Sequence, residues 1–520
     1  MRGAVAAGHT LTAEAGAEVL REGGNAVDAC IAAACMSWVT ESTLTSPGGG
    51  GFLLVRASST GRVRLHDFFT AIPGQRLAGP PREMEAVDVE FDRGASQVFR
   101  IGAASCAVPG AVAGLEAAHR AYATLPWRRL LEPAIAVARE GHELTKPQAF
   151  LHAILDVILR HTEDGREIFG PEDIRLVAGD RLVMHDLAAT LEQLAEHGAA
   201  LFYSGELGRR ISEHVRAEGG SLTEKDLAEY RVISRRPIRS SFDGHEFVSN
   251  PPPSSGGILI AYALHLVSRL GIGGPPGSAE AMSRVAEVMR EQTRARGGSF
   301  TSDLYRGGLA KRLFSGVDAA AKRIEAREAG RAEPVGAPGT THISVVDAAG
   351  NAASLTASNG SGSGVIVPGT GIHLNNMLGE YDLNPVGRRY QGRAIGRRLT
   401  SMMAPSLVLD DGRPRFVVGS AGSVRLRGAI LQIVLNVAVH GMDVSRAIAH
   451  PRVHLEEPHL HCEGGSDPAE LDRLTQWGYE LVRWRRRNLY FGGAAAVELR
   501  EDGSLDAAGD PRRGGHGVIV

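Results

Sequence analysis

The chain has 520 residues and a net charge of −2, with a sequence pI near 6.8. This balance argues against nucleic acid or an anionic membrane as a partner held by bulk charge, while the length allows two or three domains. Hydrophobic residues make up 43% of the chain, aromatic residues only 5%, and glycine occurs 65 times. We therefore expect a core of Ala, Val, Leu and Ile with many tight turns.

The four cysteines, Cys30, Cys35, Cys106 and Cys462, form no C-x-x-C pair and show no metal-ligand spacing. They fit buried thiols in a reducing compartment. The chain opens without a signal-peptide pattern, and the apolar stretch 26–39 is too short to span a bilayer. We expect a cytoplasmic protein, or a periplasmic or secreted one if a leader precedes this sequence.

The first two-thirds of the chain is predicted to be rich in helices. A helix over 12–22 ends at Gly23-Gly24, and Asn25 caps a second helix that runs to Val39. Further helical patterns cover 111–122, 130–140, 187–197, 207–218, 258–270 and 320–327. The glycine turn 46–51 leads into an apolar strand at 52–55. No Gly-Lys-Ser or Gly-Lys-Thr follows it, so it is not a phosphate loop.

After residue 340 the pattern changes to strands and hairpins. Strands are predicted at 341–347, 352–358, 406–410, 415–420, 495–500 and 505–508, joined in pairs by short turns rich in Gly and Asp. A helix over 425–439 follows the loop Gly-Ser-Ala-Gly-Ser at 419–423.

The junction between these two parts carries the first candidate for chemistry. Residues 331–339 contain two Pro and two Gly, so they are expected to form an exposed, irregular linker, and a strand follows at once from Thr340. A threonine hydroxyl needs a neighbouring base, and cutting the chain before Thr340 would provide one in the freed α-amino group. The hypothesis is self-cleavage at Gly339–Thr340. The alternative is an ordinary strand entry, for which β-branched Thr is well suited.

The loop at 419–423 carries the second candidate. A loop between a strand and a helix start presents free backbone N–H groups, with the positive end of the helix dipole behind them. Such groups can stabilise the oxyanion of an acyl-transfer intermediate. The alternative is a plain tight turn.

Other kinds of catalytic site find less support. Neither G-x-S-x-G nor H-E-x-x-H occurs in the chain. His454, His459, His461 and Cys462 cluster in sequence, but a solvated strand is favoured there over a metal site. We expect no metal and no cofactor.

Several motifs, in order along nearly the whole chain, resemble the γ-glutamyltransferase family of N-terminal-nucleophile (Ntn) hydrolases. They lie at 15–29 (Ala-Gly-Ala-Glu-Val-Leu-Arg-Glu-Gly-Gly-Asn-Ala-Val-Asp-Ala), 48–51, 252–257, 340–347 with 350–352, 374–376, 399–402, 419–423 and 510–513. The resemblance implies a four-layer αββα sandwich of class α+β. It also implies a single domain made of two associated chains after self-cleavage, a large segment 1–339 and a small segment 340–520.

The resemblance also implies roles for individual residues. Thr340 falls on the family's nucleophile and Ser358 on a hydroxyl residue that contacts it. Gly422 and Ser423 fall on the oxyanion-hole pair, where the family has Gly-Gly. The substrate-binding positions are Glu380 for the α-amino group, Thr400 and Ser401 for the α-carboxylate, and Asn359 as our choice for the family's asparagine.

The chain departs from the family at the acyl pocket. The family has Asp-Phe-Arg before Ala-Pro, and this arginine clamps the glutamyl α-carboxylate. Here Phe69 stands in its place, and Met377 replaces a family glutamine. A phenyl ring cannot make a bidentate charged contact.

The predicted function is therefore an amidase or transpeptidase that forms a threonyl acyl-enzyme on a small-molecule amide or peptide, resolved by water or an acceptor amine. The acyl group is γ-glutamyl, from glutathione-like amides, or a related one. The first alternative is a non-glutamyl amide, as in cephalosporin-acylase-like or oxamate-amidase-like relatives. The second is an uncleaved, inactive binding scaffold.

Overall fold

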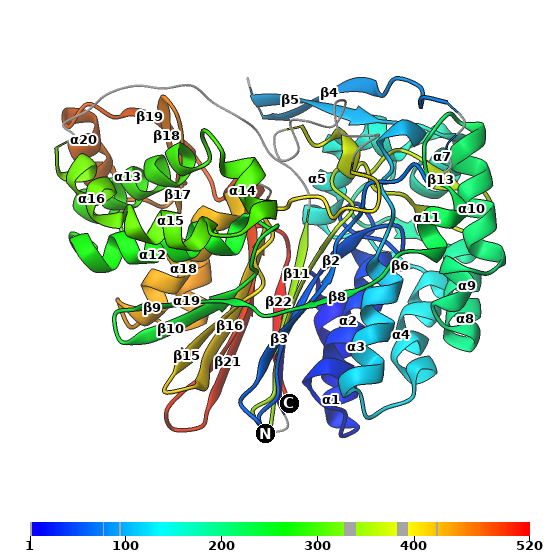
Figure 1. Cartoon of the computed structure of the whole chain (residues 1–520), viewed down its shortest axis with the longest axis horizontal. Coiled ribbons are helices and arrows are strands. Elements are labelled where there is room, and N and C mark those ends of the chain that lie inside the picture. Colours follow the sequence, from blue (N-terminus) through cyan, green and yellow to red (C-terminus); the bar gives the residue numbers. More distant parts are fainter. Residues whose placement is uncertain are drawn as a thin grey trace.

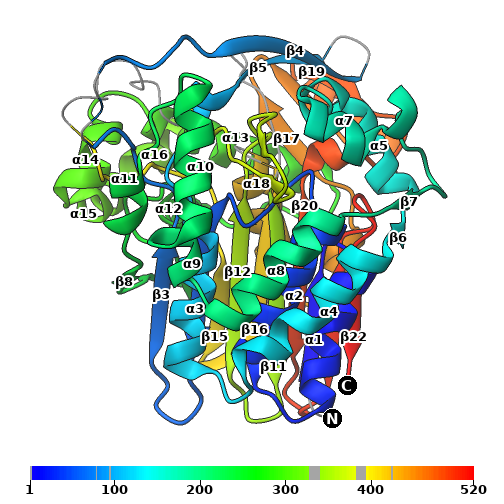
Figure 2. The same cartoon turned by 90° about the vertical axis from the view of Figure 1, so that its right-hand side faces the viewer.

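Two antiparallel β-sheets lie face to face at the centre of the protein, and helices cover both outer faces (Figure 1, Figure 2). The computed structural model describes residues 3–75, 77, 79–92, 95–326, 340–381, 394–422 and 425–520. This arrangement is the four-layer αββα sandwich that the sequence resemblance implies, so the predicted fold class is confirmed. The linker 331–339, including Gly339, lies outside the described residues.

The first sheet has seven strands and takes them from both ends of the chain. In spatial order they are β22 (His516–Ile519), β1 (Gly3–Ala7), β11 (Thr341–Asp347), β12 (Ala352–Ser358), β2 (Gly50–Arg56), β3 (Val63–Phe68) and β8 (Ile233–Arg235). Each described pair is antiparallel. The strand that follows Thr340 therefore lies in the interior of the sheet, where both edges are hydrogen-bonded.

The second sheet has six strands. In order they are β21 (Leu505–Gly509), β20 (Gly493–Leu499), β16 (Arg413–Ala421), β15 (Ser406–Asp410), β10 (His245–Ser249) and β9 (Ile238–Phe242). Three two-stranded sheets pair β13 (Ile366–Val367) with β14 (Ile372–His373), β4 (Glu85–Asp92) with β5 (Ala95–Ile101), and β6 (His142–Glu143) with β7 (Arg181–Leu182). A three-stranded sheet has β18 (His459–Cys462) between β17 (Val453–Glu456) and β19 (Glu480–Arg483).

Helices form the two outer layers (Figure 1). Beside the first sheet lie α1 (Thr10–Arg21), α2 (Ala26–Thr40), α3 (Ala111–Tyr122), α4 (Trp127–Glu140) and α8 (His185–His197), with α5 (Lys146–Ile154), α6 (Asp156–Leu159), α7 (Glu163–Phe169), α9 (Ala200–Tyr203), α10 (Glu206–Ala217) and α11 (Glu224–Ala228) around them. Beside the second lie α12 (Gly256–Leu270), α13 (Ala279–Ala295), α14 (Phe300–Arg306), α15 (Leu309–Ser315), α16 (Val317–Glu325), α18 (Leu426–Ala438), α19 (Val444–Ala449) and α20 (Pro468–Gln476).

Side-chain alternation along β2 shows how the layers pack. Phe52 and Leu54 belong to the core between the sheets, whereas Leu53 and Val55 belong to the core beneath the outer helices. Because successive side chains of a strand point to opposite faces, a strand buried on both faces is apolar throughout. Helix α2 is buried along its whole length because it packs against β11 and β12 of the first sheet and is covered by helices α1 and α4. The predicted cap is confirmed: Asn25 accepts from Val27 N and Asp28 N in a capping box.

Two further expectations concern cysteines and histidines. All four cysteines are free and buried, as predicted. The solvated strand predicted around His459 is wrong in part, because β17 and β18 bury His454 and Cys462 and leave only His459 exposed. Among the described residues, no group of His, Cys, Asp and Glu side chains could hold a metal ion. Within the same residues, no helix is both long and apolar enough to cross a membrane.

Candidate active site

Thr340 lies at the entry to β11 and is buried, with 4% of its surface exposed. Arg513 Nη1 donates a hydrogen bond of 3.2 Å to the Thr340 carbonyl oxygen. Alternation along β11 turns Thr340 to the same face as His342, whose ring packs so closely on β16 that a side chain at Gly419 would collide with it. Thr340 therefore faces the space between the two sheets.

The strand register aligns three positions with Thr340. Ala357 opposes both Thr341 and Gly51, and Gly51 opposes Phe68. One residue further along each strand, the same register brings Thr340, Ser358, Gly50 and Phe69 into one row across β11, β12, β2 and β3. Because Gly50 has no side chain, nothing from that strand stands between Ser358 and Phe69 in this row. A Cβ at Gly50 would lie 2.9 Å from the Thr70 amide nitrogen, so the position requires glycine.

Phe69 closes the far end of this row. It is 1% exposed, and its ring stacks on Phe52 with the centroids 5.4 Å apart. Its backbone is fixed on both sides, since its N–H donates to Asp67 Oδ1 and its carbonyl accepts from the Tyr230 hydroxyl. The structure therefore places an apolar ring at this end of the row.

Ser358 begins a loop that reaches Glu380. The Ser358 hydroxyl accepts a hydrogen bond of 2.8 Å from the Gly360 N–H. A Cβ at Gly360 would lie 2.8 Å from Glu380 Oε1, so the glutamate carboxyl packs against this loop. Asn376 braces the same loop, because its Oδ1 accepts from Ser361 N. The structure thus brings Ser358 and Glu380 to one loop, while their roles toward the nucleophile and the substrate stay predictions.

Asn359 and the hydroxyl pair Thr400 and Ser401 are held by other segments. Asn359 accepts from Ser46 Oγ and donates to the His373 carbonyl, so its amide lies against the glycine turn after α2. The Thr400 hydroxyl donates to the Pro253 carbonyl, and the Ser401 hydroxyl accepts from Met403 N. All three side chains are buried and have partners within the protein.

The proposed oxyanion loop follows the end of β16. Gly422 has a φ of +123°, which favours glycine, and its carbonyl accepts from the Arg425 N–H at the start of α18. A Cβ at Gly422 would lie 3.1 Å from Cα of Gly492. Ser423 lies outside the described residues, so the paired N–H groups remain a prediction.

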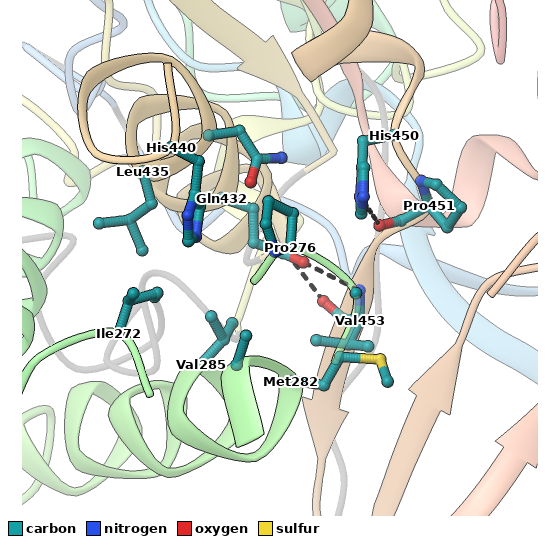
Figure 3. A pocket seen from close by; sticks show the side chains of 13 residues that line it. Ile272, Pro276, Met282, Val285, Gln432, Leu435, His440, His450, Pro451 and Val453 are labelled. Carbon is teal, nitrogen blue, oxygen red and sulfur yellow. Dashed lines mark hydrogen bonds between the residues drawn. The ribbon is translucent and has the colours of Figure 1, made fainter. Parts of the chain in front are cut away.

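A pocket elsewhere in the structure lies in the helical layer (Figure 3). It is formed between α13, α18 and β17, and encloses about 410 Å³ including the part that opens to solvent. His440 and His450 face it, and Gln432 pairs through its amide with the backbone of Val453. Its lining contains no hydroxyl or thiol nucleophile.

A family model described as gamma-glutamyltranspeptidase matches residues 12–520. The chain belongs to the γ-glutamyltranspeptidase family. The Acylase ACY 1 proenzyme of Pseudomonas sp. (strain SE83) is 33% identical to it over 539 residues, covering 100% of this chain and 94% of the relative. The glutathione hydrolase proenzyme of Escherichia coli (strain K12) is 32% identical over 536 residues, covering 98% of this chain and 90% of the relative.

Solved structures agree with this membership. The cephalosporin acylase from Bacillus halodurans has the same fold, with a TM-score of 0.83, 24% identity, and coverage of 99% of this chain and 95% of that one. The γ-glutamyltranspeptidase of Helicobacter pylori gives a TM-score of 0.54 at 29% identity over 61% of this chain and 90% of that one. The chain is therefore an enzyme of the γ-glutamyltranspeptidase family with the Ntn-hydrolase fold.

Two residues of this γ-glutamyltranspeptidase-family site carried no predicted role: Glu41 and Arg513. Glu41 follows α2, and its carboxylate accepts from Thr341 Oγ1 at 2.6 Å and from Thr12 Oγ1 at 3.1 Å. Burial raises the pKa of Glu41, while these hydrogen bonds and the charge of Arg513 act in the opposite direction. Burial lowers the pKa of Arg513 to about 10, against the charges of Asp510 and Glu41.

These two residues frame the backbone of Thr340 and Thr341. Arg513 holds the Thr340 carbonyl, and Glu41 holds the Thr341 hydroxyl on the opposite face of the strand. The signal for Arg513 was its place in the terminal Asp-Pro-Arg-Arg motif. The signal for Glu41 was a carboxyl group directly after a largely apolar helix, since buried carboxyl groups need partners.

Proposed function

We propose that this enzyme cuts its own chain before Thr340 and then hydrolyses or transfers the acyl group of an amide through an ester on the Thr340 hydroxyl. The observation that carries the proposal is the row formed by Thr340, Ser358, Gly50 and Phe69. Thr340 is the proposed nucleophile and Ser358 supplies a neighbouring hydroxyl. Gly50 adds no side chain, and the ring of Phe69 makes the far end of the row apolar. The relatives named as proenzymes, an acylase and a glutathione hydrolase, support both the cleavage and the amide chemistry.

The steps follow from the groups present. In the precursor, the Thr340 hydroxyl attacks the Gly339 carbonyl, and the scissile C–N bond breaks as its nitrogen takes up the hydroxyl proton, which leaves Gly339 as an ester on the Thr340 oxygen. Water then hydrolyses this ester, which separates the two chains and frees the Thr340 hydroxyl and α-amino group. In turnover this amine takes the hydroxyl proton while the oxygen attacks the substrate carbonyl, and the proton then goes to the leaving amine. Gly422 and Ser423 would donate their N–H groups to the oxyanion. Water or an acceptor amine then releases the acyl group.

The favoured acyl group is uncharged at the position where a glutamyl group carries its α-carboxylate. Phe69 is buried, apolar and fixed by Phe52, Asp67 and Tyr230, so it offers no donor to a carboxylate. The second candidate is a γ-glutamyl group. It is favoured by Glu380, which packs against the loop of Ser358, and by the buried hydroxyl residues Thr400 and Ser401.

The test combines sequencing and kinetics. The purified protein should separate on a denaturing gel into two fragments, with Thr340 at the N-terminus of the smaller one. The same preparation should cleave an uncharged acyl 4-nitroanilide with a higher kcat/KM than the γ-glutamyl 4-nitroanilide. An intact, inactive chain would mean a binding scaffold, and a preference for the γ-glutamyl anilide would select the second candidate.

A further inference from the structure

The pocket between α13, α18 and β17 takes no part in the mechanism above (Figure 3). It lies toward the C-terminal end of α18, whereas the loop of Gly422 leads into the N-terminal end of the same helix. The helix has 13 residues, so its two ends lie about 20 Å apart. The pocket volume of about 410 Å³ falls at the lower end of the range of about 300 to 1,000 Å³ that small-molecule sites span. The pocket is therefore a separate space of the size that a small ligand needs.

The walls of this pocket are apolar and come from both helices (Figure 3). Met282 and Val285 belong to α13 and Leu435 to α18, and each is at most 6% exposed. Apolar walls of this kind stabilise a ligand by removing its apolar surface from water, and a methionine thioether makes favourable contacts with aromatic rings. The walls thus suit a molecule with an aromatic body.

His450 presents a hydrogen-bond acceptor to the pocket. Its Nδ1 lies 2.9 Å from the Pro451 carbonyl oxygen, and because a carbonyl can only accept, Nδ1 carries the hydrogen. Burial lowers the pKa of His450, so its ring is neutral near neutral pH and Nε2 is an acceptor. A Cβ at Gly277, which also lines the pocket, would lie 3.7 Å from this Nε2. In the described part of the chain Nε2 makes no hydrogen bond, so it can accept one from a ligand.

Asn436 adds a second polar group that is open to a ligand. This residue of α18 is 9% exposed and lines the pocket, and within the described ranges its side-chain amide forms no hydrogen bond. The neighbouring Gln432 differs, because its amide donates to the Gly428 and Val453 carbonyls and accepts from Val453 N. The Asn436 amide is therefore free to donate to a ligand, while Gln432 is committed to the protein.

The charges around the pocket favour a neutral ligand. None of the described residues that line it is Asp, Glu, Lys or Arg. The charges that act on His450 are those of Arg512, Arg452 and Arg446, and all three are positive. A cationic amine would meet these charges without a carboxylate, and an anion would lose its water in an apolar pocket without a charged partner. A neutral molecule with one hydrogen-bonding group avoids both costs.

We propose that this pocket binds a small neutral phenol, as a ligand site separate from Thr340. The aromatic ring lies between Met282, Val285 and Leu435, and the hydroxyl donates to Nε2 of His450 while its oxygen accepts from the Asn436 amide. An indole N–H can donate but cannot accept, so it would leave Asn436 without a partner. The site does not depend on the amide chemistry, so its test is independent of the proposed function.

The test compares 4-fluorophenol with 4-fluoroanisole, which share the ring and the fluorine but differ in the hydroxyl hydrogen. Fluorine NMR titrations of the purified enzyme should give a Kd for 4-fluorophenol that is lower by about fivefold or more, the effect of one net hydrogen bond. His450→Phe should bring the two Kd values together. His450→Gln, which keeps an acceptor, should retain part of the difference. Equal Kd values in the wild type, or no binding of 4-fluorophenol, would overturn the proposal.

Two further variants assign the binding to this pocket. Val285→Phe fills the space from the α13 wall without changing a polar group, and it should weaken both ligands by about tenfold or more. His197→Phe changes an exposed histidine at the end of α8, in the opposite helical layer, and should keep the wild-type Kd values. If His450→Phe does not fold, Val285→Phe still decides the question. Wild-type binding of 4-fluorophenol in Val285→Phe would place the ligand elsewhere and reject the site.

Discussion

The hydroxyl of Thr341 donates a 2.6 Å hydrogen bond to Oε2 of Glu41, a residue 300 positions earlier in the chain. This bond fixes the residue next to the proposed nucleophile to the end of α2. Arg513 holds the adjacent carbonyl from the other side, and its charge acts on Glu41. The backbone around the proposed cut is thus held by two buried groups of opposite charge.

Glu41→Gln should slow self-cleavage by about 10- to 100-fold, because a hydrogen bond to a charged group contributes about 1.5 to 3 kcal/mol. The amide can still accept from Thr341, but it cannot balance the charge of Arg513. The appearance of the two fragments on a denaturing gel over time measures the rate. Glu14→Gln, which changes a partly exposed glutamate of α1, should cleave like the wild type. Equal rates in all three proteins would remove Glu41 from this role.

Thr340→Ala should remain a single chain and show no amide turnover, since both steps need the same hydroxyl oxygen. Thr340→Ser should keep part of both activities. Mass spectrometry of the purified variants gives the chain lengths, and an anilide assay gives the turnover. Cleavage that persists in the alanine variant would separate the processing step from Thr340.

Phe69→Arg should raise the ratio of γ-glutamyl to uncharged-acyl turnover by about tenfold or more, because an arginine can pair with the glutamyl carboxylate. The same change should lower the free energy of unfolding by about 3 kcal/mol, since it places a charge where a ring is stacked in the core. Phe69→Leu is the matched control and should keep the acyl preference. Kinetics with the paired anilides and urea unfolding measure the two effects. No gain in the ratio would show that Phe69 does not define the acyl pocket.

Stability should fall with acidification in a way that depends on His342. This side chain bonds Thr356 and Ser344 between the sheets, and burial lowers its pKa to about 3. Between the unfolded pKa of about 6.5 and the folded value, the unfolded chain binds more protons. The free energy of unfolding is therefore lost as the pH falls from about 6.5 toward 3.

The contribution of one such histidine is at most about 1.4 kcal/mol per pH unit. We expect the free energy of unfolding of His342→Gln, measured with urea at pH 7, 6 and 5, to fall less steeply with decreasing pH than that of the wild type. His459→Gln changes an exposed histidine of β18 and should keep the wild-type slope. If the unfolding free energies of the wild type and His342→Gln changed with pH by the same amount, His342 would not be the source of this pH dependence.

The bounds of helices and strands were predicted most accurately where the hydrophobic pattern and the turn residues at its ends agree. Strands β11, β12 and β15 begin and end at the predicted residues, because each is a short β-branched or apolar run next to a turn signal. Helix α3 agrees for a related reason, with glycine and proline ahead of it. Helix α13 received no prediction although it has 17 residues. Its helical period in Met282, Val285, Ala286 and Met289 was present in the sequence, and these side chains are buried in the structure.

The sequence identified candidate residues of the site, but it did not predict how these residues are arranged in space. The Thr340 motif and the glycine-rich loops could be read directly from the sequence. The row that joins Thr340 to Phe69 depends on strand register, which links residues hundreds of positions apart. Glu41 escaped notice because its partner, Thr341, is close only after the sheet forms. Asn359 was chosen for its residue type, and the structure turns its amide toward Ser46.

The order of strands in the first sheet has a consequence for the assembly of the mature enzyme. Strand β1 lies between β22 and β11, and β12 pairs with β2, so segments before and after residue 340 alternate across the sheet. A cut at that place would create a new chain end without creating a separable subunit. Pulling the two polypeptides apart would break the backbone ladders on both sides of β1. Dissociation of the heterodimer would then be the same event as its unfolding, and dilution alone would not separate the chains.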